Sequence, residues 1–229
     1  MMPHLPIRWS FPLAVAALLT PWVQAADWIV LFDGSSTAAW REYRKSEFPA
    51  KGWEVVDGTL HVKAGGGAGD LVTRQQFQDF DLEFEWKVSP GANSGVMYRV
   101  SETFEAPWHT GPEYQVLDDS KHADGKNPKT SASALYALVA SSSEKALRPV
   151  GEWNSARIVL RGTQLEHWLN GKKVVALDLD SPETRALIGG SKFKDMARFA
   201  RETRGHICLQ DHGDDVWFRN IRIRPMDSK

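Results

Sequence analysis

Two polar segments of this chain have residue types that suit acid–base chemistry. In the first, Gln210, Asp211 and His212 directly follow an alternating run over 205–209 and precede a Gly-Asp-Asp turn. An amide, a carboxylate and an imidazole together supply hydrogen-bond donors, acceptors and a group that titrates near neutral pH. Turns are frequently polar as well, so the spacing alone fits a site and an ordinary turn equally.

The second segment is Gly111-Pro112-Glu113-Tyr114-Gln115-Val116-Leu117-Asp118. On a strand, alternate residues share a face, so Glu113 and Gln115 lie on one side and Tyr114 and Val116 on the other. A carboxylate and an amide about 7 Å apart on a concave sheet suit sugar hydroxyls or proton transfer. A solvent-exposed Glu113 without a role fits the same pattern.

Three further candidates lie near these segments in the expected fold. Arg99 shares a strand face with Met97, and beside Glu113 it would form an ion pair or a fork for a ligand. Trp108 and His109 occupy the loop before the Glu113 strand, where a rim or lid would be. Most tryptophans sit in strand patterns and are predicted to fill the core, so only Trp108 is predicted to contact a ligand.

Lys192 lies in a glycine-flanked loop, Gly189-Gly190-Ser191-Lys192-Phe193, and is a further candidate for a substrate contact. His167 alternates with Leu165 and Leu169, which favours a packed position over a site.

The sequence motifs of nucleophilic catalysis, retaining glycosidases and metal sites are incomplete or absent. There is no Gly-x-Ser-x-Gly elbow, and the single cysteine, Cys208, is in phase with Gln210 and predicted to be buried. The Glu-x-Asp-x-x-Glu signature of retaining sandwich glycosidases is absent, because the nearest run has Gln115 in the middle, which cannot titrate. No two histidines have helical i,i+4 spacing. Asp211, Asp214 and Asp215 could hold calcium, but no complete loop pattern supports this, so no metal or cofactor is predicted.

The elements that must position these residues are mostly strands. Residues 81–88 alternate without interruption, and Asp57-Gly58 and Asn170-Gly171 are turn dipeptides of two hairpins. Further strands are expected near 28–32, 70–74, 94–100, 112–118, 133–139, 152–161, 205–210 and 216–224. Short helices are expected after Ser181-Pro182 and over 193–201. The pattern predicts an all-β antiparallel sandwich with one or two short helices.

The N-terminus predicts export. Residues 1–25 resemble a signal peptide, with an apolar core over 11–19 and Val23-Gln24-Ala25 as the cleavage pattern. We expect a periplasmic or secreted single domain over 26–229 without a membrane anchor, because the apolar run is too short to span a bilayer. The formal net charge of −1 and the lack of a basic tract argue against nucleic acid as a partner. The oligomeric state is left open.

Taken in order, the motifs resemble those of the 3-keto-disaccharide hydrolase domain family of exported bacterial proteins. The resemblance covers essentially the whole chain after residue 25. It rests on Leu31-Phe32-Asp33-Gly34, Gly69-Asp70-Leu71, residues 80–86, Asn93-Ser94-Gly95, Glu113-Tyr114-Gln115, Asn127-Pro128, Ala134-Leu135-Tyr136, Gly151-Glu152-Trp153-Asn154, His167-Trp168-Leu169-Asn170-Gly171, Gly205-His206-Ile207 and Leu209-Gln210-Asp211-His212-Gly213. Cys208 stands where glycine or another small residue is expected.

The resemblance implies a concanavalin- or laminin-G-like jelly-roll sandwich and activity on glycosides oxidised at C3. A ketone at C3 acidifies the C2 proton, so one base can form an enolate that expels the C1 aglycone, and water then adds back. We predict Glu113 and His212 as the acid–base pair, with Asp211 orienting His212. Sugar and carbonyl oxygens would be held by Gln115, Gln210 and Arg99, with Trp108, His109, Tyr136 and Lys192 completing the pocket.

Two alternatives remain open on sequence. A non-catalytic carbohydrate-binding sandwich fits the tryptophan content and the export signal, and an ordinary sandwich glycoside hydrolase fits the fold. The titratable groups at the predicted rim favour the enzyme acting on 3-keto-glycosides, because a pure binding domain needs aromatic rings and amides more than acids and bases.

Overall fold

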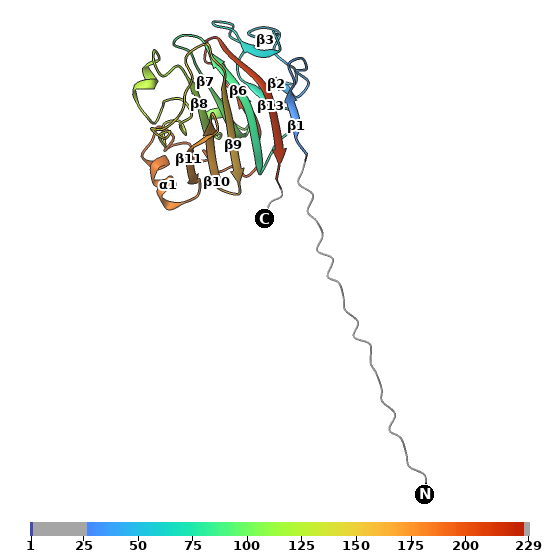
Figure 1. Cartoon of the computed structure of the whole chain (residues 1–229), viewed down its shortest axis with the longest axis vertical. Coiled ribbons are helices and arrows are strands. Elements are labelled where there is room, and N and C mark those ends of the chain that lie inside the picture. The colour runs from blue at the N-terminus through green and yellow to red at the C-terminus, as the bar shows by residue number, and fades with distance from the viewer. Residues whose placement is uncertain (2–26, 227–229) are drawn as a thin grey trace.

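The protein is a sandwich of two antiparallel β-sheets (Figure 1). This computed structural model describes residue 1 and residues 27–226, so the predicted signal segment, apart from its first residue, lies outside the described residues. The larger sheet has eight strands: β1 (Ile29–Phe32), β3 (Trp53–Val56), β4 (Thr59–Val62), β6 (Phe80–Val88), β9 (Asn154–Arg161), β10 (Gln164–Leu169), β11 (Lys172–Asp178) and β13 (Val216–Pro225). The smaller has five: β2 (Trp40–Glu42), β5 (Leu71–Thr73), β7 (Asn93–Val100), β8 (Glu113–Leu117) and β12 (His206–Leu209).

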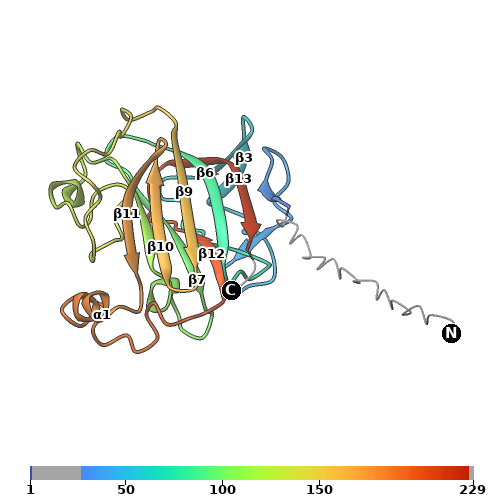
Figure 2. The ribbon, with the colours of Figure 1, turned by 60° about the horizontal axis from the view of Figure 1, so that its bottom comes forward.

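The strand order places segments distant in sequence side by side. The larger sheet runs β11-β10-β9-β6-β13-β4-β3, with β1 added against β13, and the smaller runs β2-β5-β12-β7-β8. One α-helix, α1 (Pro182–Gly189), lies beyond the β11 edge in both ribbon views (Figure 2). Ser181 caps it by accepting a hydrogen bond from the Thr184 backbone N–H at 3.2 Å, and Pro182 follows at the first helical position. Short 3-10 turns occur at η1 (Pro107–His109) and η2 (Ala123–Lys126).

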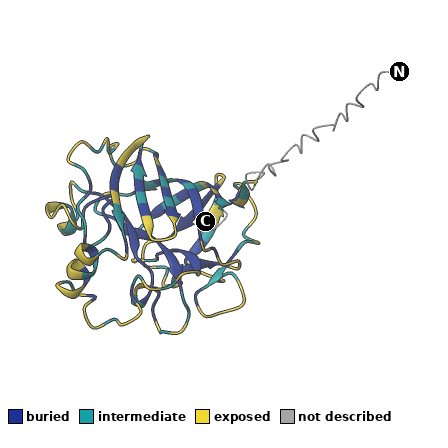
Figure 3. Ribbon diagram, turned by 90° about the horizontal axis from the view of Figure 1, so that it is seen from below, coloured by how far each residue is buried: buried dark blue, intermediate teal, exposed yellow. Residues whose placement is uncertain are grey.

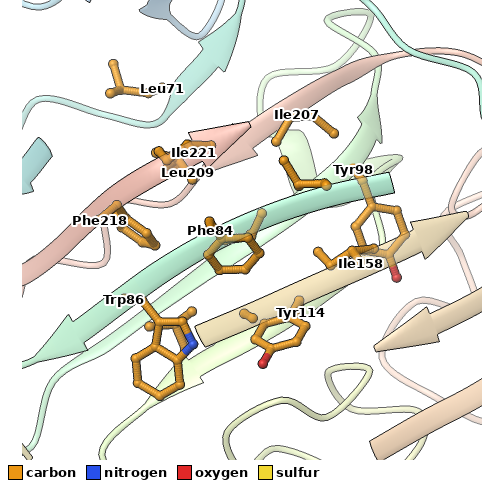
Figure 4. Packing of buried hydrophobic residues seen from close by; sticks show 14 of the residues in the cluster. Leu71, Phe84, Trp86, Tyr98, Tyr114, Ile158, Ile207, Leu209, Phe218 and Ile221 are labelled. Atoms are coloured by element: carbon orange, nitrogen blue, oxygen red, sulfur yellow. The ribbon is translucent and has the colours of Figure 1, made fainter. Parts of the chain in front are cut away.

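The core lies between the sheets and is built from one face of each strand. Leu82, Phe84, Trp86 and Val88 of β6 are all buried, as their alternation predicted. Phe84 meets Tyr114 of the opposite sheet edge to face, with ring centroids 5.6 Å apart (Figure 4). Exposed residues concentrate in loops and α1 (Figure 3). Among the described helices, none is long and apolar enough to cross a membrane.

The sequence predicted most strands, and its errors are local. The sandwich, both hairpins and the capped helix are confirmed. Residues 133–139 form only isolated bridges, residues 193–201 form turns, and β2 was not expected. In each case the segment is too short or too irregular for periodicity to identify it.

The expectation that most tryptophans fill the core is wrong. Trp40, Trp53 and Trp86 are buried. The half-buried tryptophans instead pair with cations, as where Lys87 lies 4.6 Å from the Trp217 ring centroid and Arg222 lies 4.4 Å from that of Trp28. Indole rings that are apolar on one side and bound to a cation on the other suit a strand face that meets water.

Candidate active site

A cavity of about 370 Å³ opens over the smaller sheet, on the side away from the core. It brings together both polar segments that the sequence singled out. Its lining residues are Asn93, Trp108, Gly111, Glu113, Gln115, Tyr136, Lys192, Phe193, Gln210, Asp211 and His212. A concave site lined by several polar groups and a few aromatic rings is the usual form of a small-molecule site.

Strand register places the polar groups in a row. Gln115 of β8 pairs with Gly95 of β7, and the Gln210 backbone N–H donates to the Gly95 carbonyl oxygen at 2.9 Å, extending the ladder beyond the end of β12. Leu209, Val96 and Tyr114 pack in the core. Side chains alternate between the two faces of a strand, so the residues next to these core residues, namely Gln210, Gly95 and Gln115, face the cavity.

Gly95 leaves room for the carboxyl group of Glu113. A Cβ atom at position 95 would overlap Glu113 Oε1 and would lie 2.6 Å from its Cδ and 2.7 Å from its Cγ. The Glu113 side chain therefore lies directly over the Gly95 backbone, in a space that no other residue type would leave open.

Glu113 is a buried acid that stays protonated at neutral pH. Its side chain is 7 % exposed, and burial raises its pKa to about 8. The positive charge of Lys192 opposes this shift, whereas the carboxylates of Asp70 and Asp124 add to it. A carboxyl group with a pKa near neutrality can both donate and accept a proton within one reaction cycle.

Three buried amides around Glu113 have polar atoms without a partner among the described residues. Both amide atoms of Gln115 are in this state, as are Asn93 Oδ1 and Gln210 Oε1. Gln115 is fully buried, so its amide makes no use of bulk water. Because buried polar atoms in proteins are nearly always paired, these atoms are suited to hydrogen-bonding a polar ligand in the cavity.

Lys192 comes to the cavity from the loop that follows α1. Its Nζ lies 4.2 Å from the Tyr136 ring centroid and 5.3 Å from that of Phe193. The loop is anchored by the stacking of Phe193 on Phe199, with ring centroids 3.9 Å apart. The Tyr136 hydroxyl donates to Asp124 Oδ2 at 3.4 Å. The predicted pocket residues Lys192 and Tyr136 thus share one wall.

The structure changes the role expected of Asp211. β12 ends at Leu209, so strand alternation no longer separates Gln210, Asp211 and His212, and all three line the cavity. The Asp211 carboxylate, however, accepts backbone N–H groups of Ala68 and Gly69 at 3.0 and 3.2 Å and of Gly213 at 3.0 Å. Within residues 27–226 it makes no hydrogen bond to His212. Asp211 therefore ties two loops together, and the exposed His212 is free to turn toward a ligand.

The structure does not bring Arg99 to this cavity, and that placement is corrected. The register between β7 and β12 shifts at this point. His206 pairs with Val100 and Cys208 with Met97, so three residue steps along β7 lie opposite two steps along β12, which is a β-bulge in β7. Arg99 takes φ 51° in this bulge, which turns its side chain away from the face of Met97. Its guanidinium pairs with Asp79 at 3.0 Å and donates to the Gly162 carbonyl oxygen at 2.8 Å. Arg99 and Asp79 therefore form a buried ion pair that is part of the structure of the fold and not of the cavity.

His109 also lies outside the cavity lining, whereas Trp108 is part of it. The His109 ring stacks on Phe104, with centroids 5.3 Å apart and planes 25° apart. Trp108 is 42 % exposed at the rim of the cavity. The His109 ring, held against Phe104, therefore leaves Trp108 as the residue of η1 that lines the cavity.

Four residues near the centre of the site escaped the sequence-based prediction of site residues. Asn93 and Phe193 line the cavity, Gly95 accommodates Glu113, and the Asp70 carboxylate accepts the Asp211 backbone N–H at 2.9 Å. Burial raises the pKa of Asp70 to about 7, and the charge of Asp211 adds to the shift. The motifs Gly69-Asp70-Leu71 and Asn93-Ser94-Gly95 contain three of these four residues, but neither motif by itself indicates a contact with Glu113 or Asp211.

Among the described residues, no group of three or more histidine, cysteine, aspartate or glutamate side chains is arranged to hold a metal ion. Cys208 is fully buried in a small cluster with Tyr43, Val72, Met97 and Val100, and in the strand register it pairs with Met97, which pairs with Glu113. Burial raises the pKa of the Cys208 thiol, so this residue is an apolar packing group, as predicted.

The burial of Glu113 predicts an effect on stability. Because its pKa is about 8 in the folded chain and 4.5 as a free side chain, the folded state binds more protons between these values. The free energy of unfolding should therefore fall as the pH rises from 4.5 to 8. Glu113→Gln should remove this loss and stabilise the chain by a few kcal/mol above pH 8. Urea unfolding of both proteins at pH 5 and pH 9 measures this, and an equal difference at the two pH values would contradict it.

The sandwich and its carboxyl-centred cavity define a jelly-roll protein with a candidate small-molecule site. Residues 27–224 match the model of the 3-keto-alpha-glucoside-1,2-lyase-like domain, and the chain belongs to this family. The resemblance drawn from the sequence motifs and the prediction of an enzyme are both confirmed.

Individual relatives agree with this placement. The chain is 36% identical to a 3-keto-disaccharide hydrolase of Bacteroides thetaiotaomicron over 90% of this chain and 80% of that protein. A crystal structure from Parabacteroides distasonis, provisionally called a glycosyl hydrolase, superposes with a TM-score of 0.80 at 31% identity, covering 87% of this chain and 94% of that one. The β-glucanase of Bacillus licheniformis, at 9% identity and a TM-score of 0.51, covers 90% of this chain and all of its own, and shares the fold alone.

Proposed function

We propose that this protein cleaves glycosides whose sugar ring carries a ketone at C3, with abstraction of the C2 proton, elimination of the C1 aglycone and addition of water. The observation that carries the proposal is Glu113, a single buried carboxyl with a pKa of about 8 facing a cavity lined by unpartnered amides. The 3-keto-disaccharide hydrolase of Bacteroides thetaiotaomicron supports the substrate class.

Glu113 is the one carboxyl group of the cavity lining whose pKa is raised toward neutrality, and this suits elimination better than double displacement. Double displacement needs a nucleophile and a separate acid at a fixed spacing. The other carboxylate that lines the cavity, Asp211, is held by three backbone N–H groups. Elimination from a ketone needs one base for C2, donors for the enolate oxygen and an acid for the leaving group.

The residues divide these tasks by position. Glu113 removes the C2 proton once ionised, and the positive charge of Lys192 stabilises the negative charge that develops on the C3 oxygen. Gln115, Gln210 and Asn93 bind ring hydroxyls through their unpartnered atoms. His212, exposed at the same cavity, gives a proton to the leaving oxygen.

The proposal is tested with an aryl 3-keto-glucoside and its unoxidised parent glucoside, each incubated with purified protein. Aglycone should be released from the ketone and not from the parent. Release from both at similar rates would indicate an ordinary glycosidase. Binding of the ketone without release, by protein shown to be folded, would indicate a carbohydrate-binding domain, and either result would contradict the proposal.

His212→Ala should lower kcat for substrates with a poorly leaving alkyl aglycone by about 100-fold. The loss should be much smaller for a nitrophenyl aglycone, because that leaving group departs without a proton. His212 makes no hydrogen bond to another described residue, so the melting temperature should not change. His122→Ala is the control for loss of an imidazole outside the cavity: His122 is half-buried and its Nδ1 accepts a hydrogen bond from the Asp124 backbone N–H at 3.1 Å, so this change should lower the melting temperature without altering the ratio of rates between the two aglycones. Equal losses with both aglycones would remove His212 from the role of acid.

A further inference from the structure

The Lys192 amine differs in its surroundings from the lysines of this protein that form close salt bridges. Lys45, Lys145 and Lys173 each form a salt bridge with a carboxylate at 2.6 to 2.8 Å. Lys192 forms none within residues 27–226, although its Nζ lies in the same cavity as Glu113. Its close neighbours are the ring faces of Tyr136 and Phe193. Lys87 also lies over aromatic rings without a salt bridge to another described residue, but of these two lysines Lys192 is the one that lines the cavity of Glu113.

These surroundings favour a reactive amine. Although Lys192 keeps exposed surface, partial loss of solvent around its Nζ lowers the pKa of Lys192, and the charges of Glu113 and Asp124 offset this only in part. Desolvation beside apolar groups is a known way for proteins to keep a lysine amine nucleophilic toward a carbonyl group. The carboxyl of Glu113, protonated at neutral pH, is an acid in the same cavity.

On the basis of the proposed function, we infer that Lys192 forms a covalent imine with the C3 ketone of the substrate. The inference rests on the position of its amine, which forms no salt bridge within residues 27–226, in the Glu113 cavity and on the ketone that the proposed substrate carries. An iminium group at C3 withdraws electrons more strongly than a ketone, so it acidifies the C2 proton further and replaces the enolate with a neutral enamine.

The steps balance. The neutral amine attacks C3, the carbinolamine loses water with a proton from Glu113, and the product is a C3 iminium and a Glu113 carboxylate. Glu113 then takes the C2 proton, which leaves an enamine. The nitrogen electron pair re-forms the iminium, the C2 electrons form the C1–C2 double bond, and the C1–O bond breaks as His212 gives a proton to the aglycone oxygen; His212 recovers a proton from the water that next adds at C1. Addition of one water at C1 and protonation at C2 follow, and a second water hydrolyses the iminium and frees Lys192.

A pH profile does not separate this route from the one in which Lys192 acts only as a cation. Both routes start from an enzyme with one proton shared between Glu113 and Lys192. In one the proton is on the amine and in the other on the carboxyl, and these two forms titrate together. Trapping of the covalent species and a change of the amine to a guanidinium do separate them.

The test is borohydride treatment of the wild-type protein during turnover of the aryl 3-keto-glucoside, followed by peptide mass spectrometry. We expect a mass gain of the bound keto sugar minus water plus two hydrogens, mapped to the peptide that contains Lys192. The unoxidised parent glucoside should give none. Lys192→Arg keeps the positive charge but forms no imine, and it should lose both the adduct and at least about 100-fold of kcat. Lys194→Arg, two residues away and outside the cavity lining, should retain both.

The inference is overturned if aglycone release proceeds and no adduct forms at Lys192, or if Lys192→Arg stays within about threefold of wild type. Those results leave the proposed function intact. If the wild-type protein releases no aglycone from the ketone, the proposed function fails. An adduct at Lys192 in that case would still show imine formation, and its absence would show that both are wrong.

Discussion

Glu113→Gln should reduce kcat on a 3-keto-glucoside by two to four orders of magnitude while the fold stays intact. Glutamine matches the size of the buried carboxyl but neither accepts nor donates the transferred proton. The Gly95 backbone below and the amides of Gln115 and Gln210 beside it are unaffected by the change. Substrate affinity should therefore change far less than turnover, and steady-state kinetics separates the two.

The same carboxyl determines the pH dependence. As a base, Glu113 must lose its proton, and its pKa is raised to about 8 in the folded protein. In the wild type, kcat/KM should therefore rise as the pH increases through about 8. It should fall again at higher pH, where Lys192 loses its proton, because each route needs one proton shared by the pair. The residual activity of Glu113→Gln should lack the rising limb.

Glu105→Gln is the matched control, since Glu105 is an exposed glutamate in the loop before β8 and does not line the cavity. It should retain wild-type rates and the same pH profile. Near-normal turnover in Glu113→Gln, or an unchanged rising limb, would exclude Glu113 as the base.

Gly95→Ala should cost almost as much activity as loss of the carboxyl, about 100-fold in kcat/KM. The added methyl group would occupy the position of Glu113 Oε1 and would force the carboxyl off the Gly95 backbone. Because both changes act through one group, Gly95→Ala should add little to the loss already present in Glu113→Gln. Kinetics of the two single variants and the double variant measures this coupling.

Gly189→Ala is the control for introducing a methyl group at a glycine. Gly189 ends α1, and a Cβ atom there would meet nothing within 4 Å. Its activity and melting temperature should match those of the wild type. Additive losses from Gly95→Ala and Glu113→Gln would contradict the placement of the carboxyl over Gly95.

The fold could be predicted because its strands have regular alternation. Strand β6 alternates over its whole length, and the turn dipeptides at Asp57 and Asn170 defined both hairpins. The prediction of a strand over 133–139 is wrong. Its apolar residues fit a strand pattern, but within this region only Leu135 and Val139 form bridges, Leu135 with Tyr114 and Leu135 with Val139, and these bridges are isolated. Sequence periodicity reports which residues are buried, and it does not report whether a partner strand is available.

Strand alternation in the sequence predicted only some of the residues of the site. Glu113 and Gln115 share a face because β8 is regular, so their pairing followed from period two. Arg99 was misplaced because a bulge in β7 breaks that period, and no residue in the sequence marks it. Gly95 and Asp70 matter through neighbours on other strands, and such contacts depend on strand order, which a single sequence does not provide.

Deuterium incorporation tests the central claim most directly. The wild-type protein is incubated with a 3-keto-glucoside in D₂O, the reaction is stopped early, and the released keto sugar is reduced and analysed by mass spectrometry and NMR. Removal and return of the C2 proton predict one deuterium at C2 of each product molecule, above the level from a no-enzyme incubation of the product. Products that keep protium at C2 would show direct cleavage of the C1–O bond and would contradict elimination through C2.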